Sequence, residues 1–218
     1  NTRTKLLAIV ANTRGAVDAC AFDEIRYLGY PFSISETFQL RNTNATIEES
    51  IGRVERIQNL CLKHNKEMVV YISMGFGNPY GDEWNVDIVA KWTERLSRMG
   101  ITILSLSDTI GVSNYDSISY LFSNLIPAFP TIEFGAHLHT TPDTWYEKVD
   151  AAYQNGCRRF DAAMRGFGGC PMAKDKLTGN MATENVVYYL DQKQISHGLD
   201  SKHFNEAMQM VNDVFPTH

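Results

Sequence analysis

Apolar runs of strand length alternate with helical patterns along most of this chain, and this alternation restricts the fold more than any other feature. Six runs have the pattern of strands, and they occupy residues 5–10, 24–28, 68–74, 101–108, 132–139 and 158–164. Most of them are nearly continuous in apolar and β-branched residues, which is typical of strands buried on both faces of a parallel sheet. Strands that alternate with helices predict successive βα units.

Helix start and stop signals separate these runs. Thr-Ile-Glu-Glu at 46–49 predicts a capping box at the start of one helix, and Gly100 ends another helical pattern. Thr141 followed by Pro142 predicts a helix that begins there, with the threonine as N-cap and the proline at the first helical position. Further helices are expected over 115–129, from Thr183 onward and over 201–215.

Polar residues gather where the expected strands end, and they are Asn12, Ser73, Asp108, His137, His139 and Arg165. Active sites of (β/α)8 barrels lie at that end of the strands. An open doubly wound sheet is the alternative, but no strand leads into a Gly-x-Gly-x-x-Gly turn. We therefore predict an α/β fold of the TIM (β/α)8 type, a single domain over residues 1–218 with six of the eight βα units in this chain. Apolar residues begin so soon after Asn1 that we expect the other two units to precede it.

Composition limits the partners and the compartment. A net charge of −5 and a pI near 5.7 give no bulk attraction to nucleic acid or to an anionic membrane. No apolar run has the length of a membrane span. The four cysteines lie far apart and without Cys-x-x-Cys spacing, which indicates reduced thiols in a cytoplasmic protein and argues against a structural zinc site or a disulfide framework.

His137 and His139 end the fifth expected strand with a spacing of two residues. Residues i and i+2 of a strand point to the same face, so these two imidazoles can reach one metal ion. A histidine pair without a metal is the competing interpretation. Asn180 can add an amide oxygen, and a nitrogen and oxygen set without thiolate suits Mg²⁺ or Mn²⁺ better than zinc. Asp108 is a candidate carboxylate for this site, or else a turn residue.

Cys170 lies in a glycine-rich segment, Gly-Phe-Gly-Gly-Cys-Pro-Met-Ala at 166–173. A thiol with an ordinary pKa of about 8.5 is mostly protonated at neutral pH and can act as an acid toward a carbanion or enolate. The alternative is an inert loop cysteine. The order of the histidine pair, this segment and Thr-Gly-Asn-Met-Ala-Thr-Glu at 178–184 favours the catalytic interpretation.

These motifs, together with Asp-Thr-Ile-Gly at 108–111, resemble those of 3-hydroxy-3-methylglutaryl-CoA lyase. That family belongs to the metal-dependent lyases and Claisen synthases built on TIM barrels. Residues 12–15, 47–50 and 77–80 also have counterparts in it, so the resemblance runs through the whole chain. The cysteine segment is its specific part, because the wider superfamily shares the histidine pair.

The resemblance implies a carbon–carbon lyase that cleaves 3-hydroxy-3-methylglutaryl-CoA to acetyl-CoA and acetoacetate, a reaction of leucine degradation and ketone-body metabolism. It implies His137, His139 and Asn180 as ligands of a divalent Mg²⁺ or Mn²⁺. The implied catalytic residues are Cys170, His137, Asp108 and Glu184. The expected partners are an acyl-CoA substrate and a second copy of the chain in a homodimer.

The chain departs from the family pattern at several positions. The family's remaining metal ligand, an aspartate, and a catalytic arginine lie in an Arg-Asp-Gly motif on its first strand, and no Arg-Asp-Gly occurs here. Residues 5–10 match the family's third strand. Thr140-Thr141 stands where the family has Asp-Thr, and Glu184-Asn185 where it has Glu-Asp. A related Claisen-type synthase or aldolase, and a catalytically incomplete barrel fragment, remain the alternative functions.

Overall fold

A curved parallel sheet forms the centre of the molecule. The computed structural model describes residues 4–169 and 178–214, with the backbone alone for Asn212. The strands follow one another in chain order and are β1 (Leu6–Ile9), β2 (Ile25–Ser33), β3 (Glu67–Ser73), β4 (Ile103–Asp108), β5 (Glu133–Thr140) and β6 (Arg159–Asp161). Each pairs in parallel with the next, while the short β7 (Gly179–Asn180) pairs antiparallel with β5.

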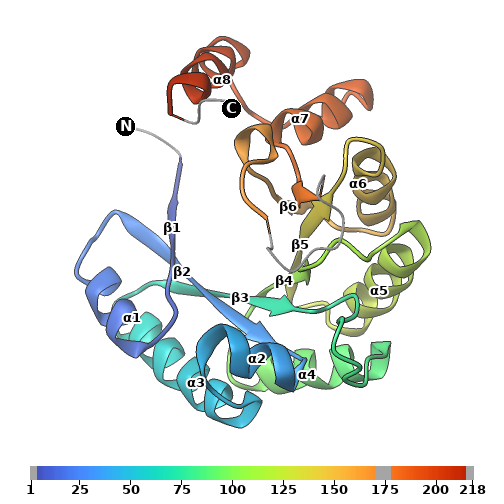
Figure 1. Ribbon diagram of the computed structural model, residues 1–218. Coiled ribbons are helices and arrows are strands. Elements are labelled where there is room, and N and C mark those ends of the chain that lie inside the picture. The colour runs from blue at the N-terminus through green and yellow to red at the C-terminus, as the bar shows by residue number, and fades with distance from the viewer. Residues whose placement is uncertain (1–3, 170–177, 215–218) are drawn as a thin grey trace.

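Helices connect the strands and surround the sheet. They are α1 (Thr13–Cys20), α2 (Glu36–Thr43), α3 (Ile47–Lys63), α4 (Val86–Arg98), α5 (Tyr115–Ala128), α6 (Trp145–Gln154), α7 (Thr183–Gln192) and α8 (Ser201–Val214), with a 3₁₀ turn η1 (Met164–Gly166). Helices α3 to α6 lie outside the curved row of strands (Figure 1). This sequential parallel order with an outer layer of helices confirms the predicted TIM-barrel type. No helix among the described residues is long and apolar enough to cross a membrane.

Two-sided burial explains why the strands could be recognised. All six residues of β4 are buried, and Leu28, Val70 and Leu104 from β2, β3 and β4 are fully buried in one core. The predicted capping box is also present, because the Thr46 hydroxyl accepts from the N–H of Glu49 and the Glu49 carboxylate accepts from the N–H of Thr46. It leaves fewer N–H groups unsatisfied at the start of α3.

The prediction of the second strand was too short. It ended at residue 28, whereas β2 continues through Pro31 to Ser33. Proline has no N–H to donate to a neighbouring strand. Within a sheet it therefore occurs where its strand has no partner strand on one side. Pro31 meets this condition because the pairing of β2 with β1 ends at Gly29, and only β3 continues alongside.

The start of the sixth helix was predicted wrongly. The helix begins at Trp145 and not at Pro142, and Thr144 occupies the N-cap position. The Thr144 hydroxyl accepts from the N–H of Thr141 at 2.9 Å, and the N–H of Thr144 donates to the carbonyl of Thr141 at 3.2 Å. These bonds close a turn before the helix, and the proline belongs to that turn. Helices α1 and α2 were not predicted as separate elements.

Strands β1 and β6 form the two edges of the parallel sheet. Among the described residues β1 pairs with β2 alone, and β6 pairs with β5 alone. Leu6 and Ile9 on β1 remain 52% and 62% exposed. An apolar edge strand of this kind presents unpaired N–H and carbonyl groups.

Candidate active site

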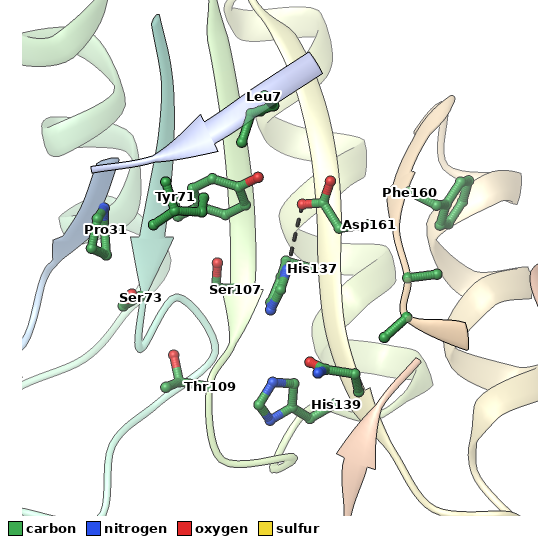
Figure 2. A pocket seen from close by; sticks show the side chains of 14 residues that line it. Leu7, Pro31, Tyr71, Ser73, Ser107, Thr109, His137, His139, Phe160 and Asp161 are labelled. Carbon is green, nitrogen blue, oxygen red and sulfur yellow. Dashed lines mark ion pairs between the residues drawn. The ribbon is translucent and has the colours of Figure 1, made fainter. Parts of the chain in front are cut away.

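A cavity of about 560 Å³ opens inside the curve of the sheet, and side chains from β1 to β7 line it. Figure 2 shows Tyr71, Ser73 and Ser107 on one side and the histidines of β5 on the other. Several of these residues come from the carboxyl ends of their strands, where barrels of this type place their active sites. The cavity is therefore the candidate active site.

His137 and His139 lie together in this cavity. Figure 2 shows both rings on the same side of β5, and their centroids are 5.6 Å apart. A metal–nitrogen bond of about 2 Å from each ring allows ring centres to lie about 6 Å apart around one ion. The Nδ1 atom of His139 is buried without a hydrogen-bond partner among the described residues. The separation of the two rings and this unsatisfied nitrogen both fit a bound cation.

The environment of His139 keeps its imidazole neutral. Burial and, to a smaller extent, the nearby His137 lower the pKa of His139 to about 4, against a weaker opposing effect of Asp108. The residue is only 5% exposed. A neutral imidazole has a free lone pair, which is the form that binds a metal.

We expect the metal-free protein to lose stability on acidification because of His139. With an ordinary pKa of 6.5 in the unfolded chain and about 4 in the folded chain, the unfolded state binds more protons between these values. The free energy of unfolding should therefore fall from about pH 6.5 downward, by about 2 kcal/mol from this residue at pH 5. Urea denaturation in the presence of a chelator at pH 7 and pH 5, on the wild type and His139→Asn, measures this. The prediction is wrong if both proteins lose equal stability.

Asn180 lies next to the histidines and is held by the glycine segment. Register pairs it with His139, and both residues line the cavity. Its Nδ2 donates to the carbonyl of Phe167 at 2.7 Å. A Cβ at Gly166 would lie 2.7 Å from the Asn180 carbonyl oxygen, and one at Gly168 would lie 2.9 Å from Nδ2. Both glycines also have positive φ values, of +65° and +84°, so this close wrapping requires glycine.

Asp161 is a residue of the cavity that the sequence analysis missed. It pairs in register with His137, and its Oδ2 lies 3.5 Å from Nδ1 of that ring (Figure 2). Ser105 donates to the same oxygen at 2.8 Å. Burial acts to raise the pKa of Asp161, but His137, Arg159 and Ser105 outweigh it and hold the pKa below its ordinary value. A carboxylate inside an expected strand, two residues after Arg159, was the signal available for it.

Asp108 does not line the cavity. The residue is 1% exposed, and its Oδ2 accepts a 2.8 Å hydrogen bond from the ammonium of Lys148. The N–H and hydroxyl of Ser113 also donate to it. Lys148 donates in addition to the carbonyl of His139 at 2.8 Å. The buried pair is therefore joined to the backbone of β5 at His139.

Glu184 does not line the cavity either. Its carboxylate accepts from the backbone N–H of Arg165 at 3.0 Å. Arg165 has a φ of +54°, a conformation that non-glycine residues rarely adopt. Glu184 thereby supports the turn that leads into the glycine segment. Cys170 lies outside the described residues.

Comparison with known proteins agrees with this geometry. A family model described as HMGL-like matches residues 7–211. The hydroxymethylglutaryl-CoA lyase of Bacillus subtilis is 31% identical over 214 residues, which are 94% of this chain and 68% of that protein. The cytoplasmic 3-hydroxy-3-methylglutaryl-CoA lyase of Danio rerio is 33% identical and covers 90% of this chain and 57% of its own length. The chain spans between 48% and 68% of the length of five such relatives.

A solved structure agrees in the same way. The HMG-CoA lyase from Acinetobacter baumannii, in complex with coenzyme A and 3-methylmalate, superposes with a TM-score of 0.86 at 26% identity. The superposition covers 98% of this chain and 70% of that one. Sequence and fold lead to the same assignment: the chain belongs to the HMGL-like family of hydroxymethylglutaryl-CoA lyases.

Proposed function

We propose that this chain carries the active site of a lyase that cleaves 3-hydroxy-3-methylglutaryl-CoA to acetyl-CoA and acetoacetate. The observation that supports it most is the meeting of His137, His139 and Asn180 in one cavity at the carboxyl end of the sheet. The segment that wraps Asn180 leads directly to Cys170. Relatives named for this activity share the sequence and the fold.

A divalent cation, Mg²⁺ or Mn²⁺, is part of this proposal. The imidazoles of His137 and His139 and the amide oxygen of Asn180 would hold it. No cluster of three histidine, cysteine or acidic residues suited to a metal occurs in the described part of the chain. When bound, the cation would polarise the substrate's tertiary hydroxyl and a carboxylate oxygen. Asp161, whose Oδ2 lies 3.5 Å from His137 Nδ1, would fix the orientation of that ring.

Side chains of this chain transfer the protons and position the reacting groups. A base takes the proton of the tertiary hydroxyl, the adjacent carbon–carbon bond breaks, and its electron pair passes to the thioester as an enolate. Cys170 gives its proton to that enolate carbon and forms acetyl-CoA. Asp108 and Glu184 would act as positioning residues, through Lys148 and through the Arg165 turn.

An assay of the purified protein with the thioester tests this function. We expect acetyl-CoA and acetoacetate in equal amounts, in a reaction that needs Mg²⁺ or Mn²⁺ and stops with a chelator. Turnover that runs only in the direction of carbon–carbon bond formation would favour the related synthases. Absence of both activities in a folded, metal-loaded protein would refute the proposal.

The histidine pair should control metal affinity. Replacing His137 or His139 by alanine removes one of three proposed ligands, so Mn²⁺ affinity in titration calorimetry should fall at least about 10-fold. His64→Ala is the matched control, because His64 is exposed at the end of α3 and does not line the cavity. Unchanged affinity in both cavity variants would remove these residues from the metal site.

We also propose that the protein acts in the cytoplasm as a homodimer with an acyl-CoA substrate. Cys20, Cys61 and Cys157 are free and buried, as reduced thiols in a cytoplasmic protein would be. Light scattering coupled to gel filtration measures the oligomeric state.

A further inference from the structure

Arg159 points into the interior of the sheet, next to the candidate active site. It lies two residues before Asp161 on β6, so both side chains are on the same face of that strand. Register pairs Arg159 with Gly135 and Asp161 with His137. The arginine side chain is only 22% exposed, and it does not line the cavity. A mostly buried guanidinium so close to the histidine strand requires an explanation.

Gly135 makes room for this side chain on β5. A Cβ at Gly135 would lie 3.3 Å from both Cγ and Nη1 of Arg159, and 3.3 Å from the hydroxyl oxygen of Ser105. These separations are shorter than ordinary van der Waals contact, so the neighbouring side chains would have to move. Strand β5 therefore has no side chain at the position where the guanidinium lies against it.

Fold stability does not explain why Arg159 is buried here. Its Nε lies 3.6 Å from Oε1 of Glu133, and its Nη2 lies 3.8 Å from Oδ1 of Asp161, so neither ion pair is close. Its Nη1 is buried without a hydrogen-bond partner among the described residues. A buried charged group with an unsatisfied N–H costs free energy. A role in the neighbouring site explains the arrangement better.

The carboxylate of Asp161 connects Arg159 with His137. Its Oδ1 faces the arginine, while its Oδ2 accepts from Ser105 at 2.8 Å and lies 3.5 Å from Nδ1 of His137 (Figure 2). Tyr71 also packs edge to face against the imidazole, with ring centroids 5.6 Å apart and planes at 85°. The two oxygens of one carboxylate thus face the guanidinium and the imidazole.

We propose that Arg159 is a positioning residue of this site. It holds Asp161 so that the carboxylate accepts from the Nδ1–H of His137 and leaves Nε2 of that ring free for the cation. A histidine that binds a metal through one nitrogen commonly donates its other N–H to a carboxylate, which fixes the tautomer. The cation itself rests on the proposed function. Arg159 acts on the metal site through Asp161, which distinguishes it from a positive charge that only repels the cation.

A double-mutant cycle on Mn²⁺ affinity tests this route, by titration calorimetry without substrate. Arg159→Gln should lower the affinity about 10-fold, the lower end of the range for groups behind a metal ligand. Asp161→Asn should lower it at least as much, because an amide can donate to Nδ1 and favour the wrong tautomer. In the Asp161→Asn background, Arg159→Gln should have no further effect. An equal loss in both backgrounds would overturn the inference.

Arg158→Gln is the matched control. Arg158 is the exposed neighbour of Arg159, and it donates to the carbonyls of Tyr153 and Cys157, so its replacement should leave Mn²⁺ affinity unchanged. Melting temperatures check that each variant is folded. If Arg159→Gln does not fold, Arg159→Lys replaces it in the cycle, because one ammonium cannot face both carboxylates as the guanidinium does. Wild-type affinity in every folded Arg159 variant would also overturn the inference.

The tautomer of His137 provides a measurement that needs neither cation nor turnover. NMR of the imidazole nitrogens in the chelator-treated wild type should show Nδ1 protonated and Nε2 unprotonated, and Arg159→Gln should show a mixture of both tautomers. The same tautomer in both proteins would contradict the proposed role. A non-additive cycle in a protein without lyase activity would refute the proposed function and leave this inference standing, and an additive cycle in an active lyase would do the reverse.

Discussion

Replacing Cys170 by serine should lower kcat by about 10²–10⁴-fold and leave KM nearly unchanged, the effect expected for loss of a positioned proton donor. A serine hydroxyl is similar in size to a thiol but is a far weaker acid. Protonation of the enolate would then depend on water. Steady-state kinetics on the Mg²⁺-loaded protein measures both constants.

Two controls make this result specific to Cys170. Mn²⁺ affinity should be unchanged, because the thiol is not among the proposed ligands. Cys20→Ala should retain turnover, since Cys20 is buried on α1 and its burial raises the pKa of its thiol. If Cys170→Ser retains full turnover in a protein that cleaves the thioester, Cys170 is no proton donor. The histidines would then be the main support for the chemistry.

Removing the ammonium of Lys148 should destabilise the fold by about 3–5 kcal/mol, the effect of breaking a buried ion pair on one side. Lys148 and Asp108 have side chains that are 2% and 0% exposed, and they are 2.8 Å apart. Lys148→Met keeps the apolar stem but leaves the Asp108 carboxylate without its counter-charge. Urea denaturation gives the free energy of unfolding.

The surface pair of Lys193 and Asp150 is the matched control. These groups are 3.5 Å apart and Lys193 is 38% exposed, so Lys193→Met should cost less than about 1 kcal/mol. A double variant of Lys148→Met and Asp108→Asn should recover part of the loss, because no uncompensated charge remains. Equal stability of Lys148→Met and Lys193→Met would show that the buried pair contributes little.

Strand burial explains how much of the fold the sequence could predict. Nearly continuous apolar runs such as the one that became β3 identified six strands and their parallel order, because two-sided burial leaves a clear pattern. Pro31 prevented recognition of the second half of β2. A strand accepts proline at this position only because its pairing with β1 has already ended, and the sequence does not show where that pairing ends. The start of α6 was predicted wrongly because Thr141 and Thr144 close a turn before the helix. Pro142 belongs to that turn and does not begin the helix.

The candidate site was predictable where its residues are close in sequence. The spacing of His137 and His139 on one strand was enough to predict a shared face, and Asn180 was named as a possible amide ligand that the family resemblance then supported. The contacts of Asp108 with Lys148 join residues 40 positions apart, and those of Ser105 with Asp161 join residues 56 apart. Such pairs depend on the register between strands and helices, which periodicity does not contain.

The contacts between the glycine segment and Asn180 have a consequence for cation binding. The Asn180 amide donates to the carbonyl of Phe167, and Asn180 lines the cavity beside His139, so one side chain contacts the segment and is a ligand of the proposed metal site. A cation that orients this amide must stabilise the wrapped conformation of residues 166–169. By thermodynamic reciprocity the wrapped conformation must tighten cation binding by the same factor.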